Sequence, residues 1–298
     1  MKKTVVFLMG VLALGGSAMA QSSMDGLRKG AYFGEEKPGL TPKIFAPDHV
    51  SLKGRYEGAI SFSPDMSEMY FTAKNDGKTA AIYTAKKIKG VWSKITKANF
   101  TKGKKDQEIH PFVSPDGNRI YFTAHSNDYT DTGMWYVPRR NGKWGEARPL
   151  DMAGKANSAF FYNQAKDGQA LYFNLETMKT DTVTHTSAGF SDPKPFEIGS
   201  GFHHAFIAPS GDYLIVAGRN KTDGRKDNDL YVSFKMAGGS WGMPINLGDA
   251  INTDVNEKSP SITHDGKFLF FGRDQKNEEG GFASIFWVST KVIEKLSP

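Results

Sequence analysis

A short motif recurs along this chain at intervals long enough to hold a whole supersecondary unit. Each copy is a tight-turn sequence followed directly by a hydrophobic run. The turn sequences are Ser63-Pro64-Asp65-Met66, Ser114-Pro115-Asp116-Gly117, Lys166-Asp167-Gly168, Pro209-Ser210-Gly211 and His264-Asp265-Gly266. Their closing residues are numbers 66, 117, 168, 211 and 266, which are 51, 51, 43 and 55 positions apart. A period of this size predicts an architecture of repeated structural units.

The turn residues have a chemical reason for their order. Proline pre-sets φ at the second position of a type I turn, and Asp or Ser at the third position hydrogen-bonds locally. Glycine then adopts the left-handed conformation that closes a hairpin. Met66 stands where the other turns have glycine. We therefore expect Met66 to be mildly strained, or its turn to be of another type.

Each unit continues with further short strands. A second hydrophobic run and then a Gly-x-Trp turn follow the motif, and an outer strand comes after that. The Gly-x-Trp turns begin at Gly90, Gly142 and Gly239, whereas the third unit has no Trp here. Four short strands per unit at this period are typical of the blades of a β-propeller. The sequence thus predicts an all-β fold, a five-bladed β-propeller of four-stranded antiparallel blades.

The last unit lacks an outer strand because the chain ends eight residues after Thr290. The segment from Pro42 to Pro47 near the N-terminus has the character of the missing strand. We expect it to pair into the fifth blade and close the ring. Residues 21–40 are then predicted to be a loose arm over the rim, and residues 41–298 to be the propeller domain.

The first twenty residues have the pattern of a signal peptide. Lys2 and Lys3 precede an apolar stretch that is too short to span a bilayer, and Ala18-Met19-Ala20 supplies a cleavage site. We expect the mature protein to be periplasmic or secreted and not inserted in a membrane. The chain contains no Cys, so its stability depends on apolar burial and strand pairing rather than on disulfides.

The charge pattern argues against nucleic-acid binding. Without Lys2 and Lys3 the formal net charge falls from +6 to +4, and the basic residues are scattered. Recognition of nucleic acid requires a basic stripe or patch. We therefore predict a small molecule, a glycan or a protein segment as the partner.

The motif resembles the PD40 repeat, a TolB-like and WD40-like repeat of exported bacterial β-propellers. Three segments carry the resemblance: residues Glu57 to Thr72, Glu108 to Thr123 and Glu257 to Phe271. The resemblance implies a propeller fold. It also implies one possible role, that of a TolB-like interaction scaffold at the cell envelope.

One rim of the predicted propeller gathers titratable side chains. The inner strands begin on this rim and the second strands end on it, because these strands are antiparallel neighbours. The candidate ligand-binding residues there are Glu57, Lys74, Glu108, His110, His125, Glu176, His203, His204, Arg219, Glu257 and Asp274. The glutamates have an alternative structural interpretation, pairing with a basic residue of the next blade or with loop amides. The four histidines indicate a metal or acid–base site, and His110 and His204 are the candidate ligands of a divalent metal.

Three functions remain open on these residues. The first is a binding module that recognises a polar ligand, a glycan or a protein segment, on the histidine-rich rim. The second is a metal-assisted lyase or hydrolase of acidic sugars, with His110, His204 and Arg219 as candidates and His125 or Glu176 as a partner. The third is the envelope scaffold. Whether the chain is an enzyme is not decided by its sequence.

Overall fold

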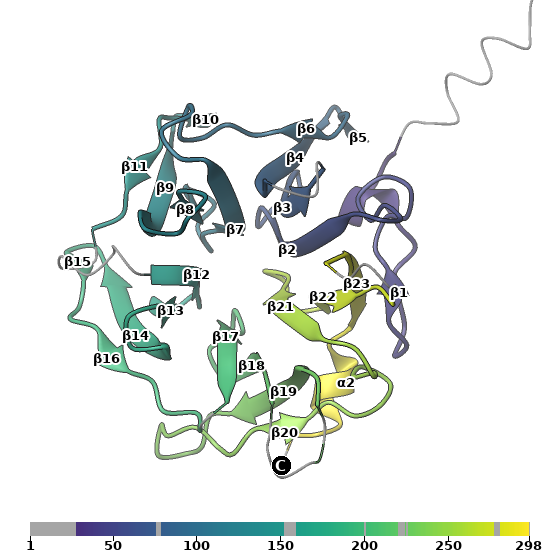
Figure 1. The fold of residues 1–298 in the computed structure, drawn as a ribbon, viewed down its shortest axis with the longest axis vertical. Coiled ribbons are helices and arrows are strands. Elements are labelled where there is room, and N and C mark those ends of the chain that lie inside the picture. The colour runs from purple at the N-terminus through teal and green to yellow at the C-terminus, as the bar shows by residue number, and fades with distance from the viewer. Residues whose placement is uncertain are drawn as a thin grey trace, which may run out of the picture.

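The computed structural model describes residues 28–75, 79–151, 159–199, 201–219, 224, 226–276 and 281–297. The fold is all-β and has the radial arrangement of a β-propeller (Figure 1). Antiparallel strand groups follow one another around a common centre, with the first long strand of each group nearest that centre. None of the helices in the described part of the chain has the length and apolar character that crossing a bilayer requires.

The strand groups follow the sequence repeat. The first contains β2 (Tyr56–Phe62), β3 (Glu68–Lys74), β4 (Ala81–Ile88), β5 (Val91–Trp92) and β6 (Thr96–Lys97). The second contains β7 (Gln107–Val113), β8 (Arg119–His125), β9 (Thr132–Arg140), β10 (Lys143–Trp144) and β11 (Arg148–Pro149). The third contains β12 (Ala159–Gln164), β13 (Gln169–Asn174), β14 (Lys179–Thr186), β15 (Gly189–Phe190) and β16 (Lys194–Pro195). The fourth contains β17 (Phe202–Ile207), β18 (Tyr213–Gly218), β19 (Asp229–Phe234) and β20 (Ile245–Asn246).

The last strands share a sheet with a segment from near the N-terminus. They are β21 (Glu257–Ile262), β22 (Phe268–Asp274) and β23 (Ala283–Ser289), and the short helix α2 (Lys291–Glu294) follows. The N-terminal strand β1 (Lys43–Ile44) pairs antiparallel with β23, with Lys43 opposite Trp287. The Phe45 N–H extends this pairing by donating to the Ile285 carbonyl at 2.8 Å.

The predicted turns are present with the expected backbone conformation. The closing residues all have positive φ: Met66 57°, Gly117 70°, Gly168 92°, Gly211 79° and Gly266 73°. Met66 therefore occupies the same left-handed conformation as the glycines, and its turn is not of a different type. An N–H···O bond of 2.9 Å from Met66 to Ser63 closes this turn as in the other units.

The expected loose arm is wrong for the described part of that segment. Tyr32 and Phe33, in the 3-10 helix η1 (Tyr32–Gly34), are 3% and 4% exposed. The Tyr32 ring packs 4.9 Å from the Phe268 ring, and its hydroxyl donates to Asp265 at 2.9 Å. Aromatic burial thus anchors this segment against the first and last strand groups. The predicted signal peptide and residues 21–27 lie outside the described residues.

Large side chains from the inner strands fill the centre of the propeller. Phe112 is 5% exposed, and its ring lies 5.9 Å from that of Phe206 and 6.2 Å from that of Tyr162. Two spaces beside this cluster have volumes of about 10 Å³ each, which is room for one water molecule at most. The apolar cluster therefore separates the two rims of the molecule.

Candidate functional site

The edge where the inner strands begin, here called the strand-start rim, collects the residues that the sequence singled out. Strand register places the start of each inner strand beside the end of its neighbour, with Tyr56 opposite Lys74 and Gln107 opposite His125. In the last group Glu257 lies opposite Arg273, directly before Asp274. The sequence correctly predicted this shared edge.

A bulge near the start of each inner strand sets the direction of the next side chains. The register shifts just after Gly58, Ile109, Phe160, His203 and Lys258. At each bulge one residue is left-handed: Ala59 45°, His110 54°, Phe161 58°, His204 49° and Ser259 49°. Bulges commonly re-aim a side chain, and here they occur at one structural position in every group. Two of the candidate histidines occupy this position.

Three histidines converge at the mouth of the strand-start rim. The ring centroids of His110 and His204 are 5.8 Å apart, and those of His203 and His204 are 4.7 Å apart. Phe160 forms an aromatic wall, with its centroid 4.5 Å from that of His110. These three histidines are called the histidine cluster below.

Buried nitrogens in the histidine cluster lack hydrogen-bond partners. In the described residues, the Nδ1 atoms of His110, His203 and His204 are inaccessible and make no hydrogen bond. Burial lowers the pKa of His110 to about 3, with a smaller contribution from His125. Burial, followed by the neighbouring His203 and His110, also holds the pKa of His204 well below its usual range. The cluster therefore offers neutral imidazoles near pH 7.

His125 lies on the same rim with a different set of contacts. Its Nδ1 is 2.8 Å from the Ser126 carbonyl, and its ring stacks on Tyr129 with a centroid separation of 4.3 Å. The Nε2 atom is buried and also lacks a partner in the described residues. Burial lowers the pKa of His125, and Lys74 and Lys105 act in the same direction. His125 is thus a fourth neutral imidazole at this rim.

The three candidate glutamates bind their own loops rather than the histidine cluster. Glu108 accepts the Phe100 N–H at 3.1 Å and the Thr101 N–H at 2.6 Å. Such bonds fix the loop that leads into the inner strand. This arrangement matches the alternative in which the acids hydrogen-bond loop amides.

Glu57 and Glu257 make a similar arrangement that includes an arginine. Arg55 donates its Nε–H to Glu57 at 2.5 Å and its Nη2–H to the Val50 carbonyl at 2.6 Å. In the last group, Arg273 donates to Glu257 at 2.8 Å and to the Ile251 carbonyl at 2.6 Å. Burial raises the pKa of Glu57 to about 7, although Arg55 opposes this shift. The arginines come from different strand positions but fasten the loops in the same way.

The other candidates surround the mouth without joining the histidine cluster directly. The Lys74 ammonium lies 5.5 Å from the centroid of the Tyr56 ring, and Lys258 lies 5.2 Å from it. Asp274 forms an ion pair with Lys258. Arg219 is exposed and lowers the pKa of His203, after the larger effect of burial. Glu176 is exposed on the turn after β13. Lys258 and Tyr56 were not predicted.

The protein ligands for a metal are incomplete in the described residues. No group of three or more His, Asp or Glu side chains there has an arrangement that could hold a metal ion. A catalytic zinc site usually has three protein ligands. His110 and His204 are thus a close pair rather than a full set.

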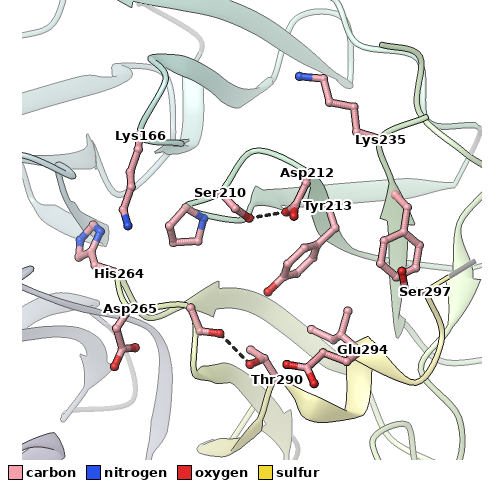
Figure 2. A pocket seen from close by; sticks show the side chains of 14 residues that line it. Lys166, Ser210, Asp212, Tyr213, Lys235, His264, Asp265, Thr290, Glu294 and Ser297 are labelled. Carbon is pink, nitrogen blue, oxygen red and sulfur yellow. Dashed lines mark hydrogen bonds between the residues drawn. The ribbon is translucent and has the colours of Figure 1, made fainter. Parts of the chain in front are cut away.

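A large cavity lies on the opposite edge, called the turn-side rim because it carries the repeated turns. Its volume is about 690 Å³, and Figure 2 shows the residues around it. Its polar lining residues are Lys166, Ser210, Asp212, Tyr213, Lys235, His264, Asp265, Thr290, Glu294 and Ser297. Reasoning from the sequence missed this cavity. The available signal was that Lys166 and His264 occupy a turn position where Pro64, Pro115 and Pro209 stand in the other units.

Comparison with known proteins supports the fold. No protein-family model matches this chain, and a search of curated proteins finds no significant relative. The GH43 endo-arabinanase from Bacillus licheniformis is similar in structure, with a TM-score of 0.52 at 11% identity over 81% of this chain and 96% of that one. The catalytic domain of the Coprinopsis cinerea GH62 alpha-L-arabinofuranosidase has a TM-score of 0.51 at 8% identity, covering 85% and 98%. A putative TolB from Agrobacterium tumefaciens has a TM-score of 0.49 at 14% identity, covering 74% and 70%.

The arabinanase is a propeller protein, so its likeness agrees with the radial strand arrangement. At this identity the likeness concerns the fold alone. Membership of the PD40 family remains a prediction.

Proposed function

We propose that this chain is an exported binding module that recognises a polar ligand at the strand-start rim. In this proposal the propeller has five blades, and β1 supplies the outer strand of the last one. The pairing of Lys43 with Trp287 supports that closure. Export to the periplasm or beyond rests on the pattern of Lys2, Lys3 and Ala18-Met19-Ala20.

The unpartnered nitrogens of the histidine cluster carry this proposal. A buried polar group without a hydrogen bond costs about 1–3 kcal/mol. His110, His203 and His204 each have such an atom at the same mouth, and His125 has another close by. Packing alone would favour an apolar side chain, as Phe161 shows at the bulge position equivalent to His110. A ligand that hydrogen-bonds these nitrogens accounts for their retention.

The chemistry of the cluster favours an uncharged polar ligand group. Neutral imidazoles donate and accept hydrogen bonds without adding charge. Phe160 adds an aromatic face against which a ring or an apolar edge can pack. Hydroxyl groups of a glycan, or amide groups of a protein segment, meet both requirements.

The same properties favour binding over acid–base catalysis. A general base works best when its pKa is near the operating pH. The pKa of His110 is about 3 and that of His204 is also strongly lowered, so neither suits this role near neutral pH. A metal would change this assessment, since imidazole is a good ligand for zinc and copper. Metal content is therefore part of the test.

The test uses a double variant that copies the protein's own repeat. His110→Phe and His204→Phe place at two bulges the residue found at Phe161. We expect wild-type protein to bind at least one member of a panel of neutral oligosaccharides and peptides, and the double variant to lose that binding. His49→Phe, at an exposed position, is the matched control and should bind normally.

Two results would contradict the proposal. One is unchanged binding by the double variant, or no binding by either protein across the panel. The other is a stoichiometric transition metal in the purified wild type that the double variant lacks. That second result would favour the metal-assisted enzyme.

A further inference from the structure

Two residues on the turn-side rim depart from the repeat at one position. Proline fills the second place of the turn at Pro64, Pro115 and Pro209, where it pre-sets the backbone. The other two units have Lys166 and His264. The Lys166 N–H donates to the Pro209 carbonyl at 3.1 Å, which explains the absence of proline there. It does not explain a lysine side chain, and departures from structural rules tend to mark functional sites.

Both departures line the same cavity. Lys166 and His264 come from different units, yet each contributes to the 690 Å³ space, and Figure 2 shows the Lys166 ammonium directed toward His264. Lys166 also lines a neighbouring cavity of about 290 Å³, together with Arg119, Gln164 and His185. It therefore stands between two adjoining spaces.

The two cations at this junction form no direct ion pair among the described residues, although Asp116 lies close enough to Arg119 for their charges to interact. Neither Lys166 nor Arg119 takes part in an ion pair there. The Arg119 Nη1 atom lies 3.3 Å from His185 Nε2, which can accept its hydrogen when the imidazole is neutral. Burial, and then Arg119, lowers the pKa of His185 and so favours that neutral form.

The acid in the smaller cavity is committed to its own turn. Asp116 accepts the Asn118 N–H at 3.0 Å and the Ser114 hydroxyl at 2.5 Å. Its second oxygen accepts the Asn118 side-chain amide at 3.3 Å. Arg119 and Lys166 together carry two positive charges against this single carboxylate, so the junction keeps a net positive charge for an anionic ligand group.

The far wall of the larger cavity has a different character. Asp212 and Glu294 lie there with the Tyr213 hydroxyl, which Figure 2 shows directed into the cavity. Carboxylates repel a second anion but accept hydrogen bonds from hydroxyl groups. The Tyr213 ring adds an apolar surface beside Phe234, with centroids 6.3 Å apart. A ligand that fits both ends has one anionic group and a hydroxylated body.

We propose that the turn-side rim binds a small molecule that carries one carboxylate or phosphate group on a hydroxylated ring. The oxyanion lies between Lys166 and Arg119, because a guanidinium fork and an ammonium together match its oxygens. The ring extends past His264 toward Tyr213, where the hydroxyls meet the acidic wall. This site is separate from the strand-start rim, since the Phe112 cluster lies between them.

Calorimetric titration of the full chain with three probes tests this site. The probes are D-glucuronate, D-glucose 6-phosphate and D-glucose. We expect one or both anionic probes to bind, more weakly as salt rises, and glucose not to bind. A preference between the two anionic probes identifies the oxyanion as carboxylate or phosphate.

Variants locate the binding. Lys166→Gln and Arg119→Gln should each weaken it about tenfold or more, because each removes a charge-assisted hydrogen bond. Lys97→Gln, at an exposed position on β6, is the matched control and should have no effect. His110→Phe should also leave this binding unchanged, which separates it from the function proposed at the other rim. Near-UV circular dichroism checks that each variant is folded.

Three outcomes would overturn the inference. They are no binding of either anionic probe, equal binding of glucose, and full binding by a folded Lys166→Gln variant. The third would place the anion elsewhere on the molecule.

Discussion

Each rim has one backbone position that repeats in every unit while its side chain differs from unit to unit. The two positions lie in different environments. At the strand-start rim the variable position is the left-handed bulge residue, which is Ala59, His110, Phe161, His204 or Ser259. At the turn-side rim it is the second turn residue, which is Pro64, Pro115, Lys166, Pro209 or His264. Four residues of the first set are buried and His204 is partly buried, whereas three members of the second set, Lys166, Pro209 and His264, line an open cavity. The repeated residues thus specify the fold, while the side chains at these two positions differ between units on the two edges where we propose binding.

The separation of the rims depends on the central aromatic cluster. Phe112 contacts His264 on the turn side, with centroids 6.1 Å apart, and follows His110 by two positions. Phe112→Ala should lower the free energy of unfolding by about 3–5 kcal/mol, because it removes a large buried ring. Urea denaturation measures this loss. Phe112→Leu is the control and should cost less, and equal losses would show that the ring is not tightly packed.

The neutral histidines of the strand-start rim should make the folded protein less stable in acid. The pKa of His110 is about 3 in the folded protein and about 6.5 in an unfolded chain. The unfolded state therefore binds more protons than the folded state between these two pKa values. As a result, the free energy of unfolding is undiminished above pH 6.5 and falls as the pH drops toward 3. Between pH 7.5 and pH 4.5, His110→Phe should therefore lose less free energy of unfolding than the wild type, by on the order of 2–3 kcal/mol.

Urea titrations at the two pH values provide the measurement. His49→Phe, at an exposed position, is the matched control. A His110→Phe protein that loses as much stability in acid as the wild type would contradict the assigned neutral state.

Substitutions of Glu108 test whether this rim residue stabilises its loop rather than binding the ligand. Glu108→Ala leaves the buried Thr101 amide and the half-buried Phe100 amide without their acceptor, and should lower the free energy of unfolding by about 1–3 kcal/mol. Glu108→Gln keeps one amide oxygen and should cost less. Ligand binding at the histidine cluster should survive both changes under stabilising conditions. A folded Glu108→Gln protein that fails to bind would instead place this side chain in the site.

The smallest effect belongs to the turn that lacks glycine. Met66→Gly removes the cost of a left-handed residue with a β-carbon, and should raise the free energy of unfolding by up to about 1 kcal/mol. The reverse change, Gly117→Ala at φ 70°, should lower it by about 1 kcal/mol. Thermal denaturation compares them. Equal melting temperatures for Met66→Gly and wild type would show that contacts of the Met66 side chain offset the strain.

The fold could be predicted from the sequence because the turn residues repeat. Gly117, Gly168, Gly211 and Gly266 gave the hairpin positions correctly, and Met66 followed them. Antiparallel pairing of neighbouring strands was enough to predict that His110 and His125 lie on the same rim. These features depend on local residue preferences, which sequence shows directly.

The bulges and the turn-side cavity could not be predicted in the same way. His110 and His204 are left-handed although neither is Gly or Asn, because the inner strand must bend there. Alternation along a strand places Glu108 and His110 on one face, but the bulge between them and Phe112 interrupts it. The cavity depends on how neighbouring turns sit against α2, which is a tertiary relation.

The pairing of β1 with β23 has a consequence for the order of assembly. Lys43 and its partner Trp287 are 244 positions apart, so the ribosome makes the first long before the second. Joining such distant segments carries an entropic cost that grows with the logarithm of the length between them, and distant pairing slows folding. Until the final residues arrive, the nascent chain carries an incomplete sheet whose open edge can pair with another molecule. A chain truncated before Ala283 should therefore aggregate rather than form a smaller propeller.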